Sequence, residues 1–344
     1  MEGLRRRFLG QALFENRRRS HPPKGRGFEH QPRLCAPAAV APAVVAGVVR
    51  ERPRFNAAAS PAYTPGVPVP SFPADTAFAA LLDRRPEVDL AAVLAEIAAD
   101  LDRRHHEFDL AAWLDEEAAL LRPALAVCPS DLDRIVVLFE AIGSRHRLGQ
   151  QEADYNDYRS SVVRSVVQNG RGLPIVLSIL VAELGARIGL ELRGVSSPGH
   201  FLLRVETDPE PMFVDAYRGG MILDTDQATA WLAQTTGYPA EMIEPSLRPA
   251  SPRLIIIRVL ENLKRQLLAA DDWTRADRVQ TRLLALRPGQ RSDQFDLAAI
   301  AAHGPNPGWA LATIRTLADE ASPEEVARLQ TIGRIARQTL IGLN

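Results

Sequence analysis

Two residues in successive apolar segments have the side chains needed for acid–base chemistry. His200 begins HFLLRVE, Asp215 lies within MFVDAY, and the DPEP between these segments is typical of a turn. The pattern predicts two antiparallel strands on which the histidine and the aspartate are neighbours, joined through one imidazole nitrogen. In such a pair the histidine can take up and return a proton while the carboxylate orients its ring.

A hydrolytic site of this kind also needs a nucleophile, which cysteine hydrolases place at the start of a helix. The segment LPIVLSILVAELGARIGL, from Leu173, is apolar on nearly every side and predicts a buried helix. A thiolate is favoured at a helix N-terminus, but the expected position is occupied here by Pro174. Proline fits a first helical turn, yet it has no nucleophilic side chain and no N–H for an oxyanion hole.

Two other residues could supply a nucleophile. Ser178 lies one helical turn beyond Pro174, and it could act only if His200 reached a full turn deeper into the core. Cys128 precedes a predicted helix start in CPSDLDRI. We favour a structural interpretation of both, since such residues more often serve as small side chains buried in the core than as nucleophiles. The rival interpretation, a hydrolase or acyltransferase using Cys128, Ser178 or a water activated by His200, stays open.

Other polar residues suggest binding rather than catalysis. Arg171, in the loop before the buried helix, could hydrogen-bond Asp154 or Asp157, or could face a ligand carboxylate. We include Ser178 and Tyr217 with Arg171 as candidate binding residues. The acidic residues lack metal-ligand spacing, and GRG at 170–172 is too short for a phosphate loop. We therefore predict no metal and no cofactor.

The elements that must position these residues follow from composition. Residues 1–74 carry twelve Lys/Arg against four Glu and are rich in proline, which predicts a disordered extension. Capped amphipathic patterns predict helices over 75–150, the first of them capped by Asp75 and the third ending at Pro123. A buried helix followed by short β-like segments predicts an α+β domain over 151–248.

The C-terminal part, 249–344, is predicted to be helical with a weak internal repeat. Ala276 and Ala310 are 34 residues apart, and Pro288 and Pro323 are 35 apart. This spacing is that of tetratricopeptide repeats (TPR), with a small residue where two helices cross. Two copies are too few for a free-standing solenoid, so we expect this tail to pack on the domain before it.

Several segments taken in order resemble the bacterial SirB family. They are DYNDYRSSVVRSVVQNG, RGLPIVLS, PGHFLLR and FVDAYRGG, within a resemblance over roughly residues 76–340. The family combines a transglutaminase-like domain with a short TPR tail. The resemblance implies a papain-like α+β fold with the histidine and aspartate retained at His200 and Asp215. This chain departs from the family pattern at Ala216, where proline is usual, and at Ser160-Ser161, where Asn-Ser is usual.

The resemblance and Pro174 together imply a degenerate transglutaminase-like site. We expect a non-catalytic, regulatory module that binds a protein or peptide partner. The net charge of −1 suggests neither nucleic acid nor an anionic membrane as partner of the folded part. The two cysteines, Cys35 and Cys128, are too few for a disulfide framework, and no apolar run reaches membrane-spanning length. A cytoplasmic location is therefore expected.

Overall fold

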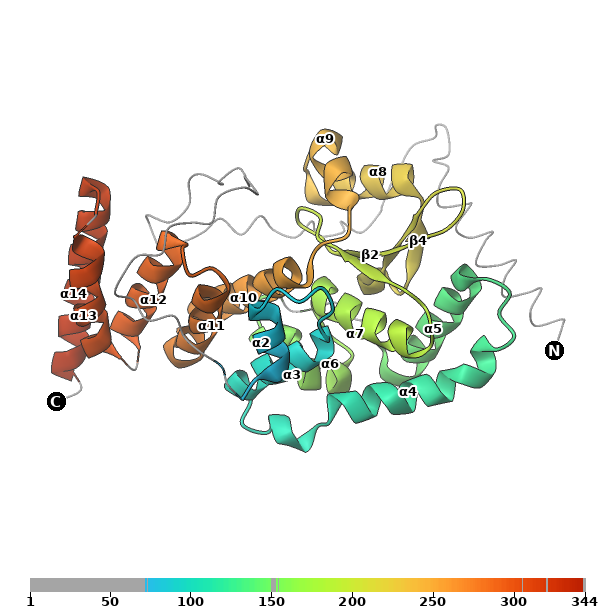
Figure 1. Cartoon of the computed structure of the whole chain (residues 1–344), viewed down its shortest axis with the longest axis horizontal. Helices are drawn as coiled ribbons and strands as arrows, with labels where there is room; N and C mark the ends of the chain where they lie inside the picture. Colours follow the sequence, from blue (N-terminus) through green and yellow to red (C-terminus); the bar gives the residue numbers. More distant parts are fainter. Residues whose placement is uncertain are drawn as a thin grey trace, which may run out of the picture. The chain divides into compact units, whose positions relative to one another are not determined.

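The computed structural model describes residues 72, 74–149, 153, 155–304, 306–319 and 321–342. The predicted disordered extension therefore lies outside the described residues, apart from Phe72 and Ala74. Helices and a small antiparallel sheet make up the described part (Figure 1). The predicted α+β class is confirmed.

The N-terminal described segment is helical, as its capping signals predict. Its elements are α2 (Thr76–Leu82), α3 (Leu90–Leu101), η1 (His105–Glu107), α4 (Leu110–Leu125) and α5 (Asp131–His146). The Asp89, Asp109 and Ser130 side chains each accept an N–H from the first turn of the helix that follows.

Two details of these helices differ from prediction. The third predicted helix, α4, continues past Pro123 to Leu125, because a proline in the last turn removes only one hydrogen bond. The N–H groups of Ala77 and Phe78 at the start of α2 are bound by the Glu96 carboxylate of α3. The Asp75 carboxylate pairs with an arginine of the tail instead of capping α2.

The central part carries the sheet. Its elements are η2 (Tyr158–Ser161), α6 (Val163–Asn169), α7 (Pro174–Arg187), β1 (Arg193–Val195), β2 (Leu202–Val205), β3 (Met212–Asp215), η3 (Ala216–Arg218), β4 (Met221–Leu223), α8 (Thr225–Thr236), α9 (Ala240–Ile243) and η4 (Glu244–Leu247). The strands pair antiparallel in the order β1-β2-β3-β4. Gly219 and Gly220, both at positive φ, make the predicted turn before β4.

Helices cover both faces of the sheet. Leu203 and Val214 pack on one face with α7, whose side chains are buried along almost its whole length. Leu202 and Phe213 pack on the other face against α8, α9 and η4. Figure 1 shows α7 on one side of the strands and α8 and α9 on the other. The second covering layer was not predicted, because α8 has a polar and only weakly apolar sequence.

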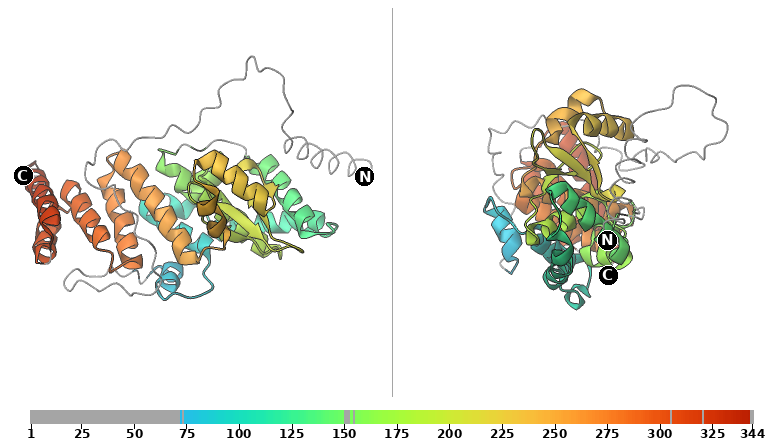
Figure 2. Two further views of the ribbon diagram at one scale, coloured as in Figure 1. Left: turned by 90° about the horizontal axis from the view of Figure 1, so that it is seen from above. Right: turned by 90° about the vertical axis from the view of Figure 1, so that its right-hand side faces the viewer.

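The C-terminal helices pack one against the next, and the first of them packs on the central part. They are α10 (Pro252–Ala269), α11 (Trp273–Leu286), α12 (Arg291–His303), α13 (Pro307–Ala318) and α14 (Pro323–Gly342). Each contacts the next (Figure 2), α10 also contacts α7, and α11 contacts α3. Ala276 of α11 and Ala310 of α13, the repeated small residues, are fully buried.

A buried arginine fastens the tail to the N-terminal helices. The Arg282 side chain of α11 is 2% exposed and pairs with the carboxylates of Asp75 and Asp100. Its guanidinium carbon lies 4.6 Å from the ring centre of Phe72 and 4.7 Å from that of Phe78. Charge pairing and cation–π contact thus act together across a long sequence separation.

None of the helices in the described residues is by itself long and apolar enough to cross a membrane. Helices α6 and α7 satisfy the length and composition criteria only as a pair, with a bend of 86° between them.

Candidate functional site

The sheet register brings His200 and Asp215 to the same end of neighbouring strands. Leu203 of β2 lies opposite Val214 of β3, so Leu202 is opposite Asp215, the last residue of β3. His200 comes two residues before β2 begins, after a turn at 198–199. The predicted strand starting at His200 therefore begins slightly later, and the histidine lies at the entrance to the strand.

The two side chains form a buried hydrogen-bonded pair. His200 Nε2 and Asp215 Oδ2 are 3.0 Å apart, and the side chains are 7% and 0% exposed respectively. The other carboxylate oxygen, Oδ1, accepts the N–H groups of Tyr217 at 3.0 Å and Arg218 at 3.2 Å. A buried carboxylate is costly unless it is hydrogen-bonded, and here both of its oxygens have partners. Nδ1 is the ring nitrogen left for a further partner.

Aromatic residues surround the imidazole. Its ring centre lies 5.0 Å from that of Trp231 in α8 and 6.3 Å from that of Tyr217, both in edge-on geometry. Tyr155 packs edge-on against Tyr217 at 6.4 Å, and its side chain is 45% exposed. The Tyr217 hydroxyl accepts the N–H of Ala153 at 3.2 Å. The predicted binding residue Tyr217 is thus beside His200.

An arginine of the tail holds the loop before the histidine. Arg258 of α10 donates to the Ser196 hydroxyl at 2.9 Å and to the Ser197 carbonyl at 2.7 Å. Burial lowers the pKa of Arg258, although the side chain remains a cation at neutral pH. Burial, together with the neighbouring Tyr217 and Asp215, raises the pKa of Tyr155, so its hydroxyl keeps its proton.

We call His200, Asp215, Tyr217, Tyr155 and Trp231 the dyad site. Sequence reasoning missed Trp231 and Tyr155. The signal for Tyr155 was present, because it lies in one of the segments that carry the family resemblance. Trp231 gave no comparable signal, since it reaches the imidazole from a helix that the sequence did not predict.

Pro174 is the first residue of α7 and is buried, as the sequence predicts. Residues 147–149 lie between the N-terminal end of α7 and the dyad site. The chain at Gly170, ahead of α7, lies against Arg147, and the chain at Gly149 lies against the carbonyl of Ala216, directly after Asp215. Helix α7 also contacts η3, which begins at Ala216. The N-terminal end of α7 is therefore the end near the histidine and aspartate.

Ser178 lies in the core, one turn beyond Pro174. It is fully buried, and its hydroxyl has no hydrogen-bond partner among the described residues. The structure thus places Ser178 away from solvent.

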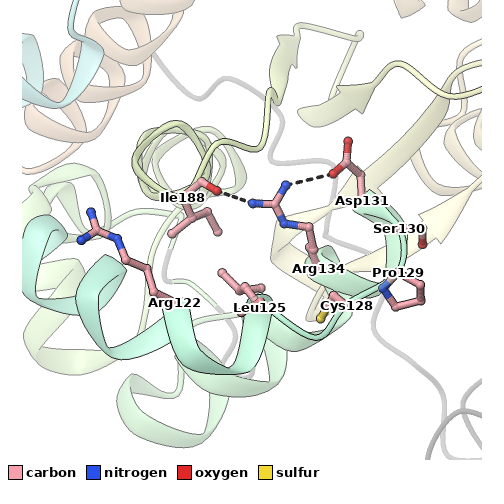
Figure 3. A pocket seen from close by; sticks show the side chains of 9 residues that line it. Arg122, Leu125, Cys128, Pro129, Ser130, Asp131, Arg134 and Ile188 are labelled. Carbon is pink, nitrogen blue, oxygen red and sulfur yellow. Dashed lines mark hydrogen bonds and ion pairs between the residues drawn. The ribbon is translucent and has the colours of Figure 1, made fainter.

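Cys128 lies at the other end of α7. It occupies the turn between α4 and α5 and borders a cavity of about 610 Å³ (Figure 3). Ile188, the C-cap of α7, lines the same cavity, and Arg134 donates to its carbonyl. At 1.5 Å per residue, the 14 residues of α7 separate Ile188 from Pro174 by about 20 Å. The structure therefore does not bring Cys128 to the dyad site, and Cys35 lies outside the described residues.

Arg171 is exposed and lies in a different cavity, near the ends of α5 and α6. Of its two predicted partners, Asp157 accepts the N–H groups of Arg159, and Asp154 lies outside the described residues. Within the described part of the chain, no group of three or more His, Cys, Asp or Glu side chains is arranged to hold a metal ion.

The comparisons agree with this architecture. Residues 91–261 match the family model described as Transglutaminase-like superfamily. A UPF0162 protein of Xylella fastidiosa (strain Temecula1) is 35% identical over 140 residues, 40% of this chain and 50% of the relative. A UPF0162 protein of Vibrio cholerae is 32% identical over 141 residues, 41% of this chain and 52% of the relative. The matched part of the chain thus spans about half the length of these curated relatives. No solved structure matches the chain.

The match shows that residues 91–261 form a transglutaminase-like domain, as the sequence motifs predict. It includes α3 to α5 and the first half of α10 as well as the sheet. The SirB name, the TPR tail and the domain boundaries at 74, 150 and 248 stay predictions.

Proposed function

We propose, from the transglutaminase-like domain of residues 91–261, that the chain is a non-catalytic module that binds a protein or peptide segment at the dyad site. The observation that carries the proposal is Pro174 at the first position of α7. A cysteine at this position would have the helix N-terminus beside it, and α7 contacts η3, which directly follows the aspartate that holds the imidazole. A helix N-terminus and an imidazole are the two features that activate a thiol. Proline has no atom that could attack a carbonyl carbon.

The surroundings of the histidine favour a peptide-like ligand. Tyr155, Tyr217 and Trp231 offer flat apolar surface together with hydroxyl and indole donors, the combination that is enriched at protein interfaces. The helices α10 to α14 add a TPR-like surface suited to a second segment of the same partner. Such a module acts by holding a partner, which is the basis of the regulatory role that we propose.

A test of the absence of catalysis uses a thiol-reactive, amide-type probe. We expect no labelling that depends on His200: the wild type and His200→Ala should react alike, and any label should map to Cys35 or Cys128. Labelling at Cys128 or Ser178 that disappears in His200→Ala would show an active hydrolase and would contradict the proposal.

A test of binding uses selection of random displayed peptides against the wild-type chain. Selected peptides should bind Trp231→Ala at least about tenfold more weakly, because aromatic anchors dominate such interfaces. Trp113→Ala, in α4, is the matched control, since it removes the same type of side chain outside both proposed binding surfaces. If both variants bind like the wild type, or if only Trp113→Ala loses binding, the ligand does not occupy the dyad site.

A further inference from the structure

We propose that the cavity at the C-terminal ends of α5 and α6 binds a small molecule that carries a phosphate or diphosphate group. This cavity has a volume of about 680 Å³ and is lined by Arg145, Arg147, Arg159 and Arg171, together with His146 and Asp157. We call it the arginine cavity. It is distinct from the dyad site, and the proposal does not depend on the proposed function.

Three separate segments bring the arginines together. Arg145 lies in the last turn of α5 and Arg147 caps it, Arg159 lies in η2, and Arg171 lies in the loop before α7. Basic residues are commonly enriched at the C-terminus of a helix, but this cluster draws its arginines from more than one helix end. The usual enrichment therefore does not account for it. The fold assembles the cluster from parts of the chain up to 26 residues apart.

The lining of the arginine cavity is positively charged, since it includes four arginines and one aspartate. Arg145 pairs with the Glu117 carboxylate, which His146 shares, and Arg159 pairs with Asp157. Each guanidinium has five N–H donors, so an arginine that already holds one carboxylate can still donate to an anion beside it. The C-terminal ends of α5 and α6 each add only roughly half a negative charge. A divalent anion would suit this lining.

Arg147 has an unusual backbone conformation for its side chain. It is the C-cap of α5 with φ 60°, in the left-handed region where glycine is the favoured residue. Among the described residues Arg147 has no ion-pair partner, so its guanidinium is available to an anion that enters the arginine cavity.

The recognition chemistry fits phosphate oxygens better than a carboxylate. Planar guanidinium groups bind phosphate through paired hydrogen bonds, and several arginines can surround one group with many oxygen atoms. Gln168 and Asn169 line the same cavity and offer amide groups to the rest of a ligand. The cavity volume falls within the range of small-molecule sites, which favours a soluble ligand over an extended macromolecule.

Isothermal titration calorimetry of the full chain with inorganic pyrophosphate tests this proposal. We expect saturable binding at one site that weakens as sodium chloride is added. Arg171→Gln should weaken binding at least about tenfold, because it removes a guanidinium that can form paired hydrogen bonds. Arg193→Gln is the matched control, since Arg193 is an exposed arginine of β1 that pairs with Glu191, and it should bind like the wild type.

The Arg147→Gly variant tests the effect of losing this guanidinium on binding without a loss of stability. Glycine fits φ 60° without strain, so this variant should unfold at the same temperature as the wild type or a higher one. Its affinity for pyrophosphate should nevertheless fall at least about tenfold. The proposal is overturned if the wild type gives no saturable heat at millimolar pyrophosphate. It is also overturned if Arg147→Gly and Arg171→Gln both bind like the wild type.

Discussion

Asp215 holds His200 through one carboxylate oxygen and the start of η3 through the other. The aspartate therefore has a structural task that does not depend on catalysis. Its carboxylate is fully buried and satisfies one imidazole and two backbone N–H groups. Removing the carboxylate would leave both the imidazole and the turn before β4 without this hydrogen-bond acceptor.

We predict that Asp215→Ala lowers the free energy of unfolding by about 2–5 kcal/mol, because it leaves the buried imidazole and two partly buried N–H groups without an acceptor. Asp215→Asn should lose less, since its side-chain oxygen can still accept one of these bonds. Urea denaturation measures both. Asp226→Ala, at an exposed position in α8, is the control and should be nearly neutral. If the Asp215→Ala variant were as stable as the wild type, Asp215 would not be a buried hydrogen-bond partner of His200.

We predict that Pro174→Cys creates a reactive thiol. The helix N-terminus and the nearby imidazole should favour its thiolate, so iodoacetamide should label it faster than Cys128. His200→Ala should slow this labelling, while His146→Ala, which alters a histidine paired with Glu117, should not. Mass spectrometry of tryptic peptides assigns the label to each cysteine.

The stability of Pro174→Cys should also fall, by up to about 1 kcal/mol, because the proline ring restricts the unfolded chain. Equally slow labelling of the introduced thiol and of Cys128 would mean that the N-terminus of α7 does not face the histidine.

We predict that Arg282 is required to hold the tail on the N-terminal helices. Arg282→Ala leaves the carboxylates of Asp75 and Asp100 without their shared cation and should cost about 3–5 kcal/mol. Arg282→Lys should recover only part of this loss, because an ammonium cannot pair with two carboxylates and lie against two rings as a planar group does. Limited proteolysis should cut Arg282→Ala near α2 sooner than the wild type, and an unchanged pattern would contradict the prediction.

We predict a pH effect at Glu183 of α7. Its carboxylate accepts the Leu90 N–H at 3.0 Å, and burial, followed by the neighbouring charge of Asp89, raises its pKa. The folded state therefore binds this proton more tightly than the unfolded state. Its contribution to stability is present at acidic pH, below the unfolded pKa, and is lost as pH rises through the folded pKa.

Glu183→Gln keeps an acceptor for Leu90 but cannot ionise. Relative to the wild type, the variant should gain stability as pH rises above the ordinary glutamate pKa of about 4.3, as measured by urea denaturation over a series of pH values. Glu116→Gln, at an exposed position in α4, provides the comparison and should show no such gain. A difference between Glu183→Gln and the wild type that does not change with pH would argue against the raised pKa.

Local signals in the sequence were sufficient for most of the fold. Side-chain caps such as Asp89, the apolar segment from Leu173 and the Gly219-Gly220 turn each act within a few residues, so they can be read from the chain. Helix α8 was missed because its burial depends on a sheet face formed by residues elsewhere. Asp75 was misassigned because a distant arginine competes for its carboxylate.

The candidate site was predictable where strand alternation fixes the geometry. His200 and Asp215 follow from two adjacent segments and a turn, whereas Trp231 and Arg258 reach the same region from helices further along the chain. Contacts of this kind depend on how layers pack, which no local pattern encodes. The arginine cavity belongs to the same class, since each of its arginines alone looks like an ordinary surface residue.

The order β1-β2-β3-β4 follows the order of the chain, and this has a consequence for synthesis on the ribosome. Every strand pairs with the strand made just before it, so closing the sheet requires only short loops, which form quickly. The contact between Arg282 and Asp75 instead spans 207 residues. We therefore expect the histidine and aspartate to meet while the tail is still being translated, and the two ends of the domain to join last.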